Sequence, residues 1–333
     1  MYPSISKIRQ KIFSGEGFDF EQTALELFEF QYTYNSVYRQ FTDYLKINPE
    51  TVTSIQQIPF LPIEFFKTHR IICDNEQPQK IFESSGTTGQ VTSKHLVADL
   101  SLYEESFRNG FRNFYGYEKD WTILALLPSY LERDTSSLVY MVNDWIQQSQ
   151  SIHSGFYLNN LNELAEKISA LQSQHTPILL IGVTFALLDF AELYPMDLSD
   201  VIVMETGGMK GRREEMTRAE VHALLKSAFN LRQVHSEYGM TELLSQAYSK
   251  GEGIFRTPRW LKVLKRDIYN PLTVNCEPGR GGLNVIDLAN IHSCAFIATQ
   301  DVVHILSDDT FEIFGRTDNA DVRGCNLMVT SSF

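Results

Sequence analysis

The residues best suited to chemistry in this chain form a short polar run that could hold a phosphate group. The run is Ser84-Ser85-Gly86-Thr87-Thr88-Gly89, and Lys94 follows it five residues later. Glycines let main-chain N–H groups approach an anion closely, hydroxyl groups add donors, and a lysine adds positive charge. The lysine stands too far from the second glycine for a Walker A loop, and such residues also cluster in ordinary turns. The run alone leaves a phosphate site and an ordinary polar loop about equally favoured.

Four further segments with glycine, acidic and aromatic residues lie downstream. They are Glu-Thr-Gly-Gly-Met-Lys at residues 205–210, Tyr-Gly-Met-Thr-Glu at 238–242, Thr-Gln-Asp at 299–301 and Gly-Arg-Thr-Asp at 315–318. With the first run, and in this order, they resemble the motifs of the adenylate-forming enzymes, which include acyl- and aryl-CoA ligases and luciferases. The resemblance extends from about residue 80 to the end, and the second and fourth of these segments are its most specific parts.

A narrower resemblance rests on the short chain, the Ser-Ser-Gly-Thr-Thr-Gly-x-x-x-Ser-Lys-His form of the loop at residues 84–95, and Cys325 near the C-terminus. These features look like the acyl-protein synthetases of the bacterial bioluminescence fatty acid reductase system; phenylacetate-CoA ligases are more distantly similar. The resemblance implies an α/β fold: an adenylate-forming large domain of parallel β-α-β units with a helical N-terminal region, a short strand-rich part and a truncated small C-terminal domain.

The resemblance also implies roles in binding ATP and Mg²⁺. The β- and γ-phosphates would be held by Ser84, Ser85, Gly86, Thr87, Thr88 and Gly89, with Lys94 adding charge. Thr241 would contact the α-phosphate and Glu242 would ligate Mg²⁺. Gly207 and Gly208 would lie against adenine while Tyr238 packs on its ring. Asp301 would accept hydrogen bonds from the ribose hydroxyls, and Arg316 would donate to the same sugar.

Each of these residues has a simpler structural alternative. Asp301 could cap a strand end, Glu242 could cap a helix beginning near Thr241, and Tyr238 could be an aromatic residue at an interface. Singly, these alternatives are favoured; the ordered set favours nucleotide binding. A histidine such as His235 is more often a core or rim residue than a catalyst.

A basic cluster follows the second glycine pair. Its members are Lys210, Arg212 and Arg213. They could receive pyrophosphate, and solvated surface charge is an equally good explanation.

Cys325 is the sharpest catalytic hypothesis. By resemblance its thiolate would attack the acyl-adenylate and form a thioester with release of AMP. The alternative is a small buried apolar residue. Cys325 is the ninth residue after Arg316, and if extended at ~3.4 Å per residue these nine residues would span roughly 30 Å. We therefore expect an arm that could visit both the adenylate and a partner's active site.

The elements that must position these residues alternate along the chain. Helical spacing of apolar residues over 5–45 predicts a helical entry, and residues 58–67, with two prolines, should break the helix and pack aromatic side chains on the body. Apolar runs at 121–127, 178–183 and 201–204 predict buried parallel strands with motifs at their ends. Residues 254–314 are richer in short strands, with a turn at 279–282. We expect a helical region at 1–75, an adenylate-forming core at 76–314 and a hinge-like tail at 315–333.

Composition excludes several function classes. The chain has 333 residues, 41 acidic against 29 basic, and a net charge of -12, so nucleic acid is an unlikely partner. The apolar run at 178–191 is too short to cross a bilayer, and the N-terminus lacks a signal-peptide core. The four cysteines show no Cys-x-x-Cys pair and no metal-ligand spacing, which suits a reducing cytoplasm. We expect a cytoplasmic protein without a membrane span.

The expected activity is ATP-dependent activation of a fatty acid and its transfer to a cysteine thiol, feeding an acyl reductase protein partner. No lysine follows Lys265, whereas the family's small domain normally supplies one, so Lys94, Lys210 or a partner would provide that charge. One alternative is an acyl- or aryl-CoA ligase, in which Cys325 would have no catalytic role. The other is a catalytically silent nucleotide-binding subunit.

Overall fold

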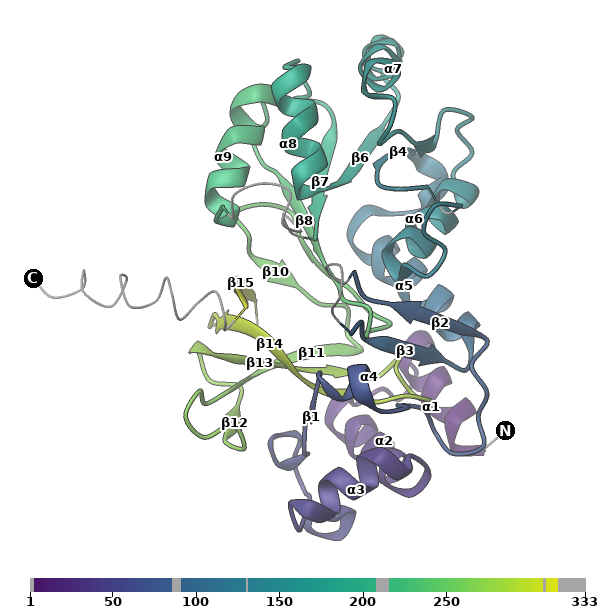
Figure 1. Ribbon diagram of the computed structural model, residues 1–333, viewed down its shortest axis with the longest axis vertical. Helices are drawn as coiled ribbons and strands as arrows, with labels where there is room; N and C mark the ends of the chain where they lie inside the picture. The colour runs from purple at the N-terminus through teal and green to yellow at the C-terminus, as the bar shows by residue number, and fades with distance from the viewer. Residues whose placement is uncertain (1–2, 86–90, 130, 208–215, 308–309, 317–333) are drawn as a thin grey trace, which may run out of the picture.

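A computed structural model describes residues 3–85, 91–129, 131–207, 216–307 and 310–316. Their strands form one 13-stranded sheet and a separate two-stranded hairpin. The large sheet runs β12-β11-β13-β14-β15-β10-β9-β8-β7-β6-β4-β5, and β1 pairs with β14 beside this path (Figure 1). One half of this sheet is parallel and the other is almost entirely antiparallel, so the molecule has the mixed α/β architecture expected from the sequence.

The parallel half consists of five neighbouring strands: β5 (Gly155–Phe156), β4 (Thr122–Leu126), β6 (Ile178–Val183), β7 (Ile202–Thr206) and β8 (His235–Tyr238). All residues of β4 and β6 are buried. This burial explains their uninterrupted apolar runs, because helices cover both faces of a parallel sheet. The predicted parallel strands are confirmed.

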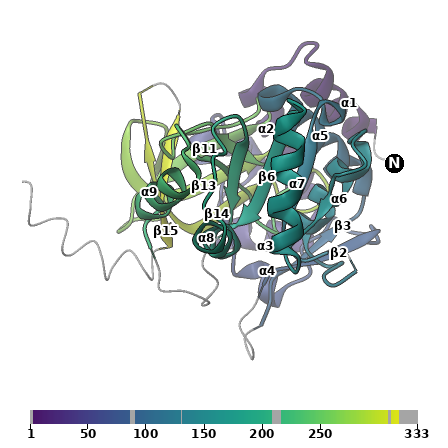
Figure 2. The same cartoon turned by 90° about the horizontal axis from the view of Figure 1, so that it is seen from above.

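Helices cover this half from two sides. Figure 1 shows α8 (Thr184–Leu193) and α9 (Arg218–Phe229) on the left of the strands, and α5 (Leu100–Tyr115) and α6 (Ser137–Gln148) on the right. Seen from above, α7 (Leu161–Ser173), α8 and α9 follow one another across the strands (Figure 2). The carboxyl ends of the strands therefore open between two helical layers, where ligands of such sheets bind.

The antiparallel half continues the same sheet. Its strands are β9 (Ala247–Ser249), β10 (Phe255–Arg256), β15 (Phe311–Arg316), β14 (Phe296–Ile305), β13 (Gly279–Asp287), β11 (Leu261–Arg266) and β12 (Val274–Asn275). Strands β10 and β15 share one paired position, Phe255 opposite Phe311, and these rings stack with centroids 5.6 Å apart. Little strand pairing therefore joins the sheet at this point.

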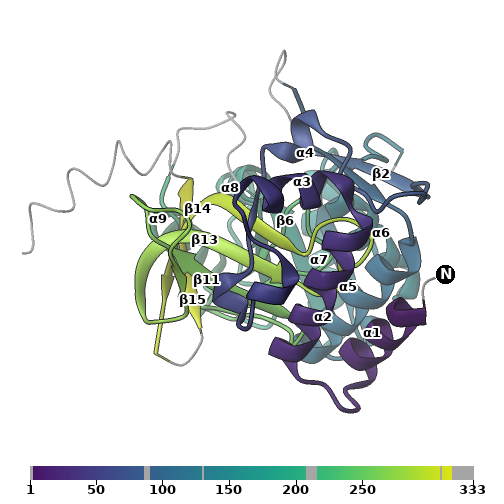
Figure 3. The same cartoon turned by 90° about the horizontal axis from the view of Figure 1, so that it is seen from below.

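The N-terminal helices α1 (Pro3–Ser14), α2 (Phe20–Tyr34) and α3 (Ser36–Tyr44) lie under the antiparallel half (Figure 3). Phe28 and Tyr38 bring their rings within 6.1 and 5.9 Å of the Phe296 ring of β14. The side chain of Gln31 donates to the carbonyl groups of Asn290 and Ile291. The helical entry predicted for residues 5–45 is confirmed, and it is anchored to the segment between β13 and β14.

The proline-containing segment that follows forms β1 (Leu61–Pro62) and the short helix α4 (Phe65–Thr68). Its aromatic side chains pack as expected: the Phe60 ring lies 6.4 Å from that of Phe296, and the Phe66 ring lies 5.8 Å from the imidazole of His95. Beyond it, β2 (Lys80–Glu83) and β3 (Lys94–Val97) pair as the antiparallel hairpin. The predicted phosphate run connects these two strands.

The turn predicted at residues 279–282 is wrong, because these glycines begin β13 instead. A Cβ at Gly281 would lie 2.6 Å from the carbonyl oxygen of Arg266 on β11, and one at Gly282 would lie 2.7 Å from the Arg266 guanidinium carbon. The glycines allow two strands and an arginine side chain to approach closely, which is a known use of glycine inside strands. No helix of the described residues is long and apolar enough to cross a membrane.

Asp287, at the end of β13, fixes the segment that follows β8. Its buried carboxylate accepts hydrogen bonds from the main-chain N–H groups of Leu244, Ser245 and Ala289 and from the Ser245 hydroxyl, at 2.7, 3.0, 3.2 and 2.5 Å. Burial raises the pKa of Asp287 to about 6, so the group is ionised at neutral pH. Four donors directed at one carboxylate hold an irregular segment in place.

We predict that Asp287→Asn lowers the free energy of unfolding by about 2–3 kcal/mol, because the amide points a donor at N–H groups that need an acceptor. Urea unfolding at pH 7 measures this loss. Asp120→Asn, on an exposed aspartate, is the matched control and should change stability little. An equally small effect of both substitutions would contradict the anchoring role of Asp287.

Candidate active site

The hairpin of β2 and β3 positions the first run of the sequence analysis. Ser84 and Ser93 close its base, since the Ser84 main-chain N–H donates to the Ser93 carbonyl at 3.1 Å and the Ser93 N–H donates to the Ser84 hydroxyl oxygen at 2.9 Å. Ser85 follows as an exposed residue. Gly86, Thr87, Thr88 and Gly89 lie outside the described residues. The described residues therefore show a hairpin whose base is closed at Ser84 and Ser93.

Lys94 is the first residue of β3 and pairs across the hairpin with Glu83. Its ammonium Nζ lies 3.5 Å from Glu83 Oε1, and its side chain is exposed. An anion that arrives at the hairpin tip would compete with this carboxylate for the lysine. The lysine is therefore held near the run by a weak, solvent-screened ion pair.

His95 joins the hairpin to the segment after β8. Its Nδ1 lies 2.8 Å from the carbonyl oxygen of Thr241, and its Nε2 lies 3.1 Å from Asn290 Oδ1. Asn290 in turn donates through Nδ2 to the carbonyl oxygen of Glu242 at 2.9 Å. Two buried side chains thus hold both carbonyl groups of the Thr241-Glu242 pair. This link places the polar hairpin next to the Tyr-Gly-Met-Thr-Glu segment.

Burial decides the charge of His95. Burial lowers the pKa of His95 to about 4, although its hydrogen bonds to Thr241 and Asn290 act in the opposite direction. The imidazole is fully buried and hence neutral at physiological pH. Its role is to position the turn.

The Tyr-Gly-Met-Thr-Glu segment leaves the end of β8 as a turn. The Leu243 N–H donates to the Met240 carbonyl, and no helix begins at Thr241 or Glu242. The alternative that Glu242 caps a helix is therefore wrong. Thr241 is half-buried, and Glu242 is only 5% exposed. Among the described residues, no group of three or more His, Cys, Asp and Glu side chains forms a metal site.

Tyr238 and Asp301 meet although 63 residues separate them. The Tyr238 hydroxyl donates to Asp301 Oδ2 at 2.6 Å. Asp301 lies within β14, so it does not cap a strand end, and its paired residue on β15 is Arg316. Three residues assigned to adenine and ribose by resemblance thus lie on neighbouring parts of the fold.

The glycine segment begins at the end of β7. Gly207 has φ +72°, a left-handed conformation that favours glycine, and its carbonyl accepts a hydrogen bond from Thr184 at 3.1 Å. The preceding Glu205 is bound by Arg218, with Nε and Oε1 3.0 Å apart. Burial would raise the pKa of Glu205, but contacts with His222, Arg218 and Ser236 outweigh it and hold the pKa below its ordinary value.

The remaining predicted residues divide into two groups. Gly208, Cys325 and the basic cluster of Lys210, Arg212 and Arg213 lie outside the described residues. His235 is described: its Nδ1 lies 3.1 Å from the Tyr115 hydroxyl, and burial lowers its pKa to about 4. This environment matches the core or rim role given as its alternative.

The structure gives roles to residues that the sequence left without one: His95, Thr184, Arg218, Glu237 and Asn290. His95 is the last residue of the loop motif at 84–95, and Glu237 directly precedes the Tyr-Gly-Met-Thr-Glu segment, so their positions in the sequence were the available signal. The others come from distant segments and carry no local pattern.

We predict that His95 makes the protein less stable in acid. Its pKa falls from 6.5 to about 4 on folding, so between these values the unfolded chain binds a proton that the folded chain does not. Stability from this group is full above pH 6.5 and declines as pH falls, by about 2 kcal/mol at pH 5. Urea unfolding between pH 7 and pH 5 should show a shallower decline for His95→Gln than for the parent.

The exposed His175 provides the matched control, since His175→Gln should keep the parent's decline. If His95→Gln keeps it as well, the neutral state assigned to His95 is wrong.

Comparisons with known proteins agree with the fold. The family model described as "Acyl-protein synthetase, LuxE" matches residues 16–116. A long-chain-fatty-acid–luciferin-component ligase of Vibrio harveyi is 23% identical, over 92% of this chain and 86% of the relative.

Solved structures show the same architecture. A 2-hydroxyisobutyryl-CoA ligase has a TM-score of 0.59 at 11% identity, covering 90% of this chain and 75% of that one. ATP-bound MatB of Rhodopseudomonas palustris has a TM-score of 0.50 at 14% identity, covering 71% of this chain and 47% of that one. The match over residues 16–116 and the ligase relative make this chain similar to the LuxE-type acyl-protein synthetases, and the solved structures show that it has the fold of the adenylate-forming ligases.

Proposed function

We propose that this ligase activates a fatty acid with ATP and transfers the acyl group to its own Cys325, from which a reductase partner receives it. The observation that carries the nucleotide half of this proposal is the convergence of three segments: the hairpin reaches Thr241 through His95, and Tyr238 at the end of β8 binds Asp301 on β14. The relative named as a long-chain fatty acid ligase supports the acid substrate.

The first step joins the acid to the nucleotide. A carboxylate oxygen attacks the α-phosphorus of ATP, a P–O bond forms, and pyrophosphate leaves with the bonding electrons. Catalysis of this step consists mainly of alignment and of stabilising the accumulating negative charge. The hairpin with Lys94 would hold the leaving phosphates, and Thr241 would contact the α-phosphate.

Mg²⁺ would bind at Glu242. A magnesium ion in such sites is held by one or two carboxylates together with substrate phosphates, so a single carboxylate beside a phosphate hairpin fits its ligand preferences. When bound, the ion would neutralise phosphate charge. The protein's own part would be to position residue 242, whose main-chain carbonyl accepts a hydrogen bond from Asn290.

The second step moves the acyl group to sulfur. The Cys325 thiolate would attack the acyl carbon, a C–S bond would form, and AMP would leave. Two of the described cysteines are unsuited to this role: burial raises the pKa of Cys294 to about 12 and raises that of Cys73 well above its ordinary value. Both thiols therefore stay protonated. Cys276 is half-buried, and we use it as the control cysteine for substitution.

We predict that Asp301→Asn raises the KM for ATP by about tenfold to a hundredfold, equivalent to roughly 1.4–2.8 kcal/mol. A carboxylate offers two acceptors to a ribose diol while the amide offers one. Pyrophosphate release at varied ATP concentration measures this effect, and Asp120→Asn should keep the parent's KM. An unchanged KM for Asp301→Asn would remove Asp301 from the nucleotide site.

We predict an acyl-sized increase in intact mass after incubation of the protein with Mg²⁺-ATP and a panel of fatty acids. Hydroxylamine should remove the added mass, Cys325→Ser should not gain it, and Cys276→Ser should. Pyrophosphate release with acyl transfer only to free CoA would favour a CoA ligase. ATP binding without pyrophosphate release would favour a silent subunit.

A further inference from the structure

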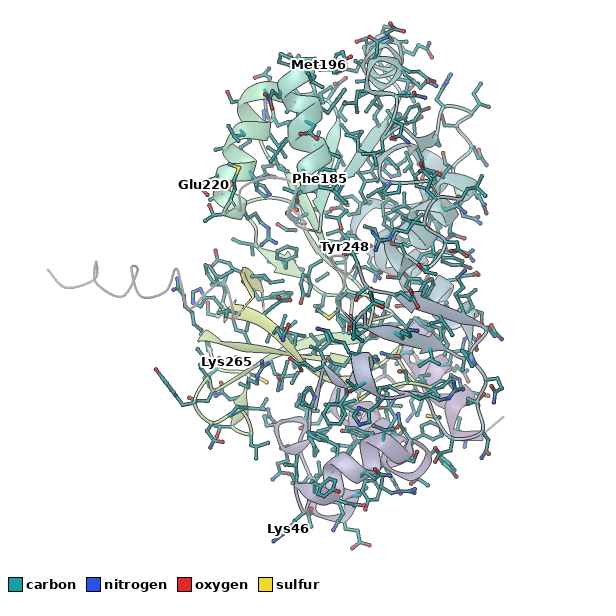
Figure 4. The ribbon with its side chains drawn as sticks, in the orientation of Figure 1. Lys46, Phe185, Met196, Glu220, Tyr248 and Lys265 are labelled. Carbon is teal, nitrogen blue, oxygen red and sulfur yellow. The ribbon has the colours of Figure 1, made fainter. Side chains whose placement is uncertain are left out.

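Glu237 is a buried carboxyl group that the proposed steps leave without a role. It stands on β8 directly before Tyr238 and is 7% exposed. Its Cα pairs with Thr206 of β7 on one side and with Tyr248 of β9 on the other. Figure 4 shows Tyr248 at the middle of the molecule. Glu237 therefore lies inside the sheet at the level where both nucleotide motifs begin.

One oxygen of Glu237 ties the two motif-bearing strands together. The Thr206 hydroxyl donates a short hydrogen bond to Glu237 Oε2. Thr206 precedes Gly207 of the glycine segment, and Glu237 precedes Tyr238. The hydrogen bond thus fixes the spacing between Gly207 and Tyr238, which would lie against the adenine ring in the proposed site.

The other oxygen lies under the turn that follows. A Cβ added to Gly239 would lie 2.5 Å from Glu237 Oε1 and 3.3 Å from Gln246 Cγ. A side chain at this position would displace the carboxyl group of Glu237. The position of Glu237 therefore sets the path of the Tyr238-Gly239 backbone.

The surroundings favour a proton on this carboxyl. The carboxyl group is buried, so its charged form would lose most of its hydration. Burial, together with repulsion from Glu205, raises the pKa of Glu237 to about 7, although the Thr206 hydrogen bond lowers it.

The neighbouring titratable groups leave this proton in place. Glu205 on β7 adds negative charge and is itself paired with Arg218. Phenol groups on α5 and β9 also interact electrostatically with Glu237: Tyr103, Tyr115 and Tyr248. All three have raised pKa values, and His235 on β8 has a lowered one, so none of these four titrates near pH 7.

We infer that Glu237 is a positioning residue for the nucleotide: its protonated carboxyl, held by Thr206 under Gly239, sets the gap between Gly207 and Tyr238, and its ionisation weakens nucleotide binding. This inference rests on the proposed nucleotide site. A carboxylate in this position is buried and is repelled by Glu205. When Glu237 ionises, the turn after β8 would move so that water can reach the carboxylate.

The first experiment measures binding of a non-hydrolysable ATP analogue with Mg²⁺ by calorimetry between pH 6 and pH 8.5. The affinity of the parent should fall by about tenfold as pH rises through 7, which corresponds to about 1.4 kcal/mol of coupling. Glu237→Gln, which carries a permanent amide donor, should bind as the parent does at pH 6 and keep that affinity at pH 8.5. Comparing the two proteins cancels the titration of the nucleotide itself.

The second experiment needs no nucleotide. Infrared difference spectra of the parent should show a protonated-carboxyl C=O band that disappears as pH rises through 7 and is absent from Glu237→Gln. Thr206→Val removes the hydrogen bond that lowers the pKa, so the midpoint of this band should move to higher pH. Failure of the midpoint to move, or absence of the band, would overturn the assignment of the proton.

The outcomes separate this inference from the proposed function. Equal pH profiles of binding in the parent and Glu237→Gln would overturn the positioning role while the nucleotide site stands. Absence of binding at every pH, in protein that the infrared spectra show to be folded, would overturn the nucleotide site and this inference with it.

Discussion

The need to satisfy the backbone of one irregular turn organises the structure around the candidate site. Residues 239–246 leave the sheet after β8 and form no helix, so their polar groups require partners from elsewhere. Asp287 supplies acceptors for Leu244 and Ser245, while His95 and Asn290 bind the carbonyl groups of Thr241 and Glu242. These partners come from β13, β3 and the segment before β14. The turn is therefore a point where three distant segments must be correctly placed at once.

This arrangement gives the N-terminal helices a part in holding the turn. Gln31 of α2 binds the carbonyl oxygen of Asn290 and receives the N–H of Ala295, so it holds the loop that carries Asn290. A buried polar chain of this kind is stabilising only when every member is satisfied. Helix α2 thus helps to hold Asn290, and Asn290 in turn donates a hydrogen bond to the main-chain carbonyl of Glu242.

Much of the fold could be predicted because its strands are apolar and uninterrupted, as in β4 and β6, and the motif order pointed to the ligase family. The contacts of the site could not be predicted. No local sequence pattern links Tyr238 to Asp301, 63 positions later. No such pattern shows that the Glu237 carboxyl accepts a hydrogen bond from Thr206 either. The glycines at 279–282 were misjudged because turns and close strand approaches use the same residue, and only the position of Arg266 distinguishes them.

The single paired position between β10 and β15 makes this line the weakest seam of the sheet. The parallel half carries Tyr238 and the glycine segment; Asp301 belongs to the antiparallel half. A small rotation of the two halves about the β10–β15 pair would break few main-chain hydrogen bonds. Arg218 binds both Glu205 and the Ile313 carbonyl, so the rotation would pivot at this side chain. The Tyr238–Asp301 hydrogen bond spans the two halves, so its length would report how far such a rotation has gone.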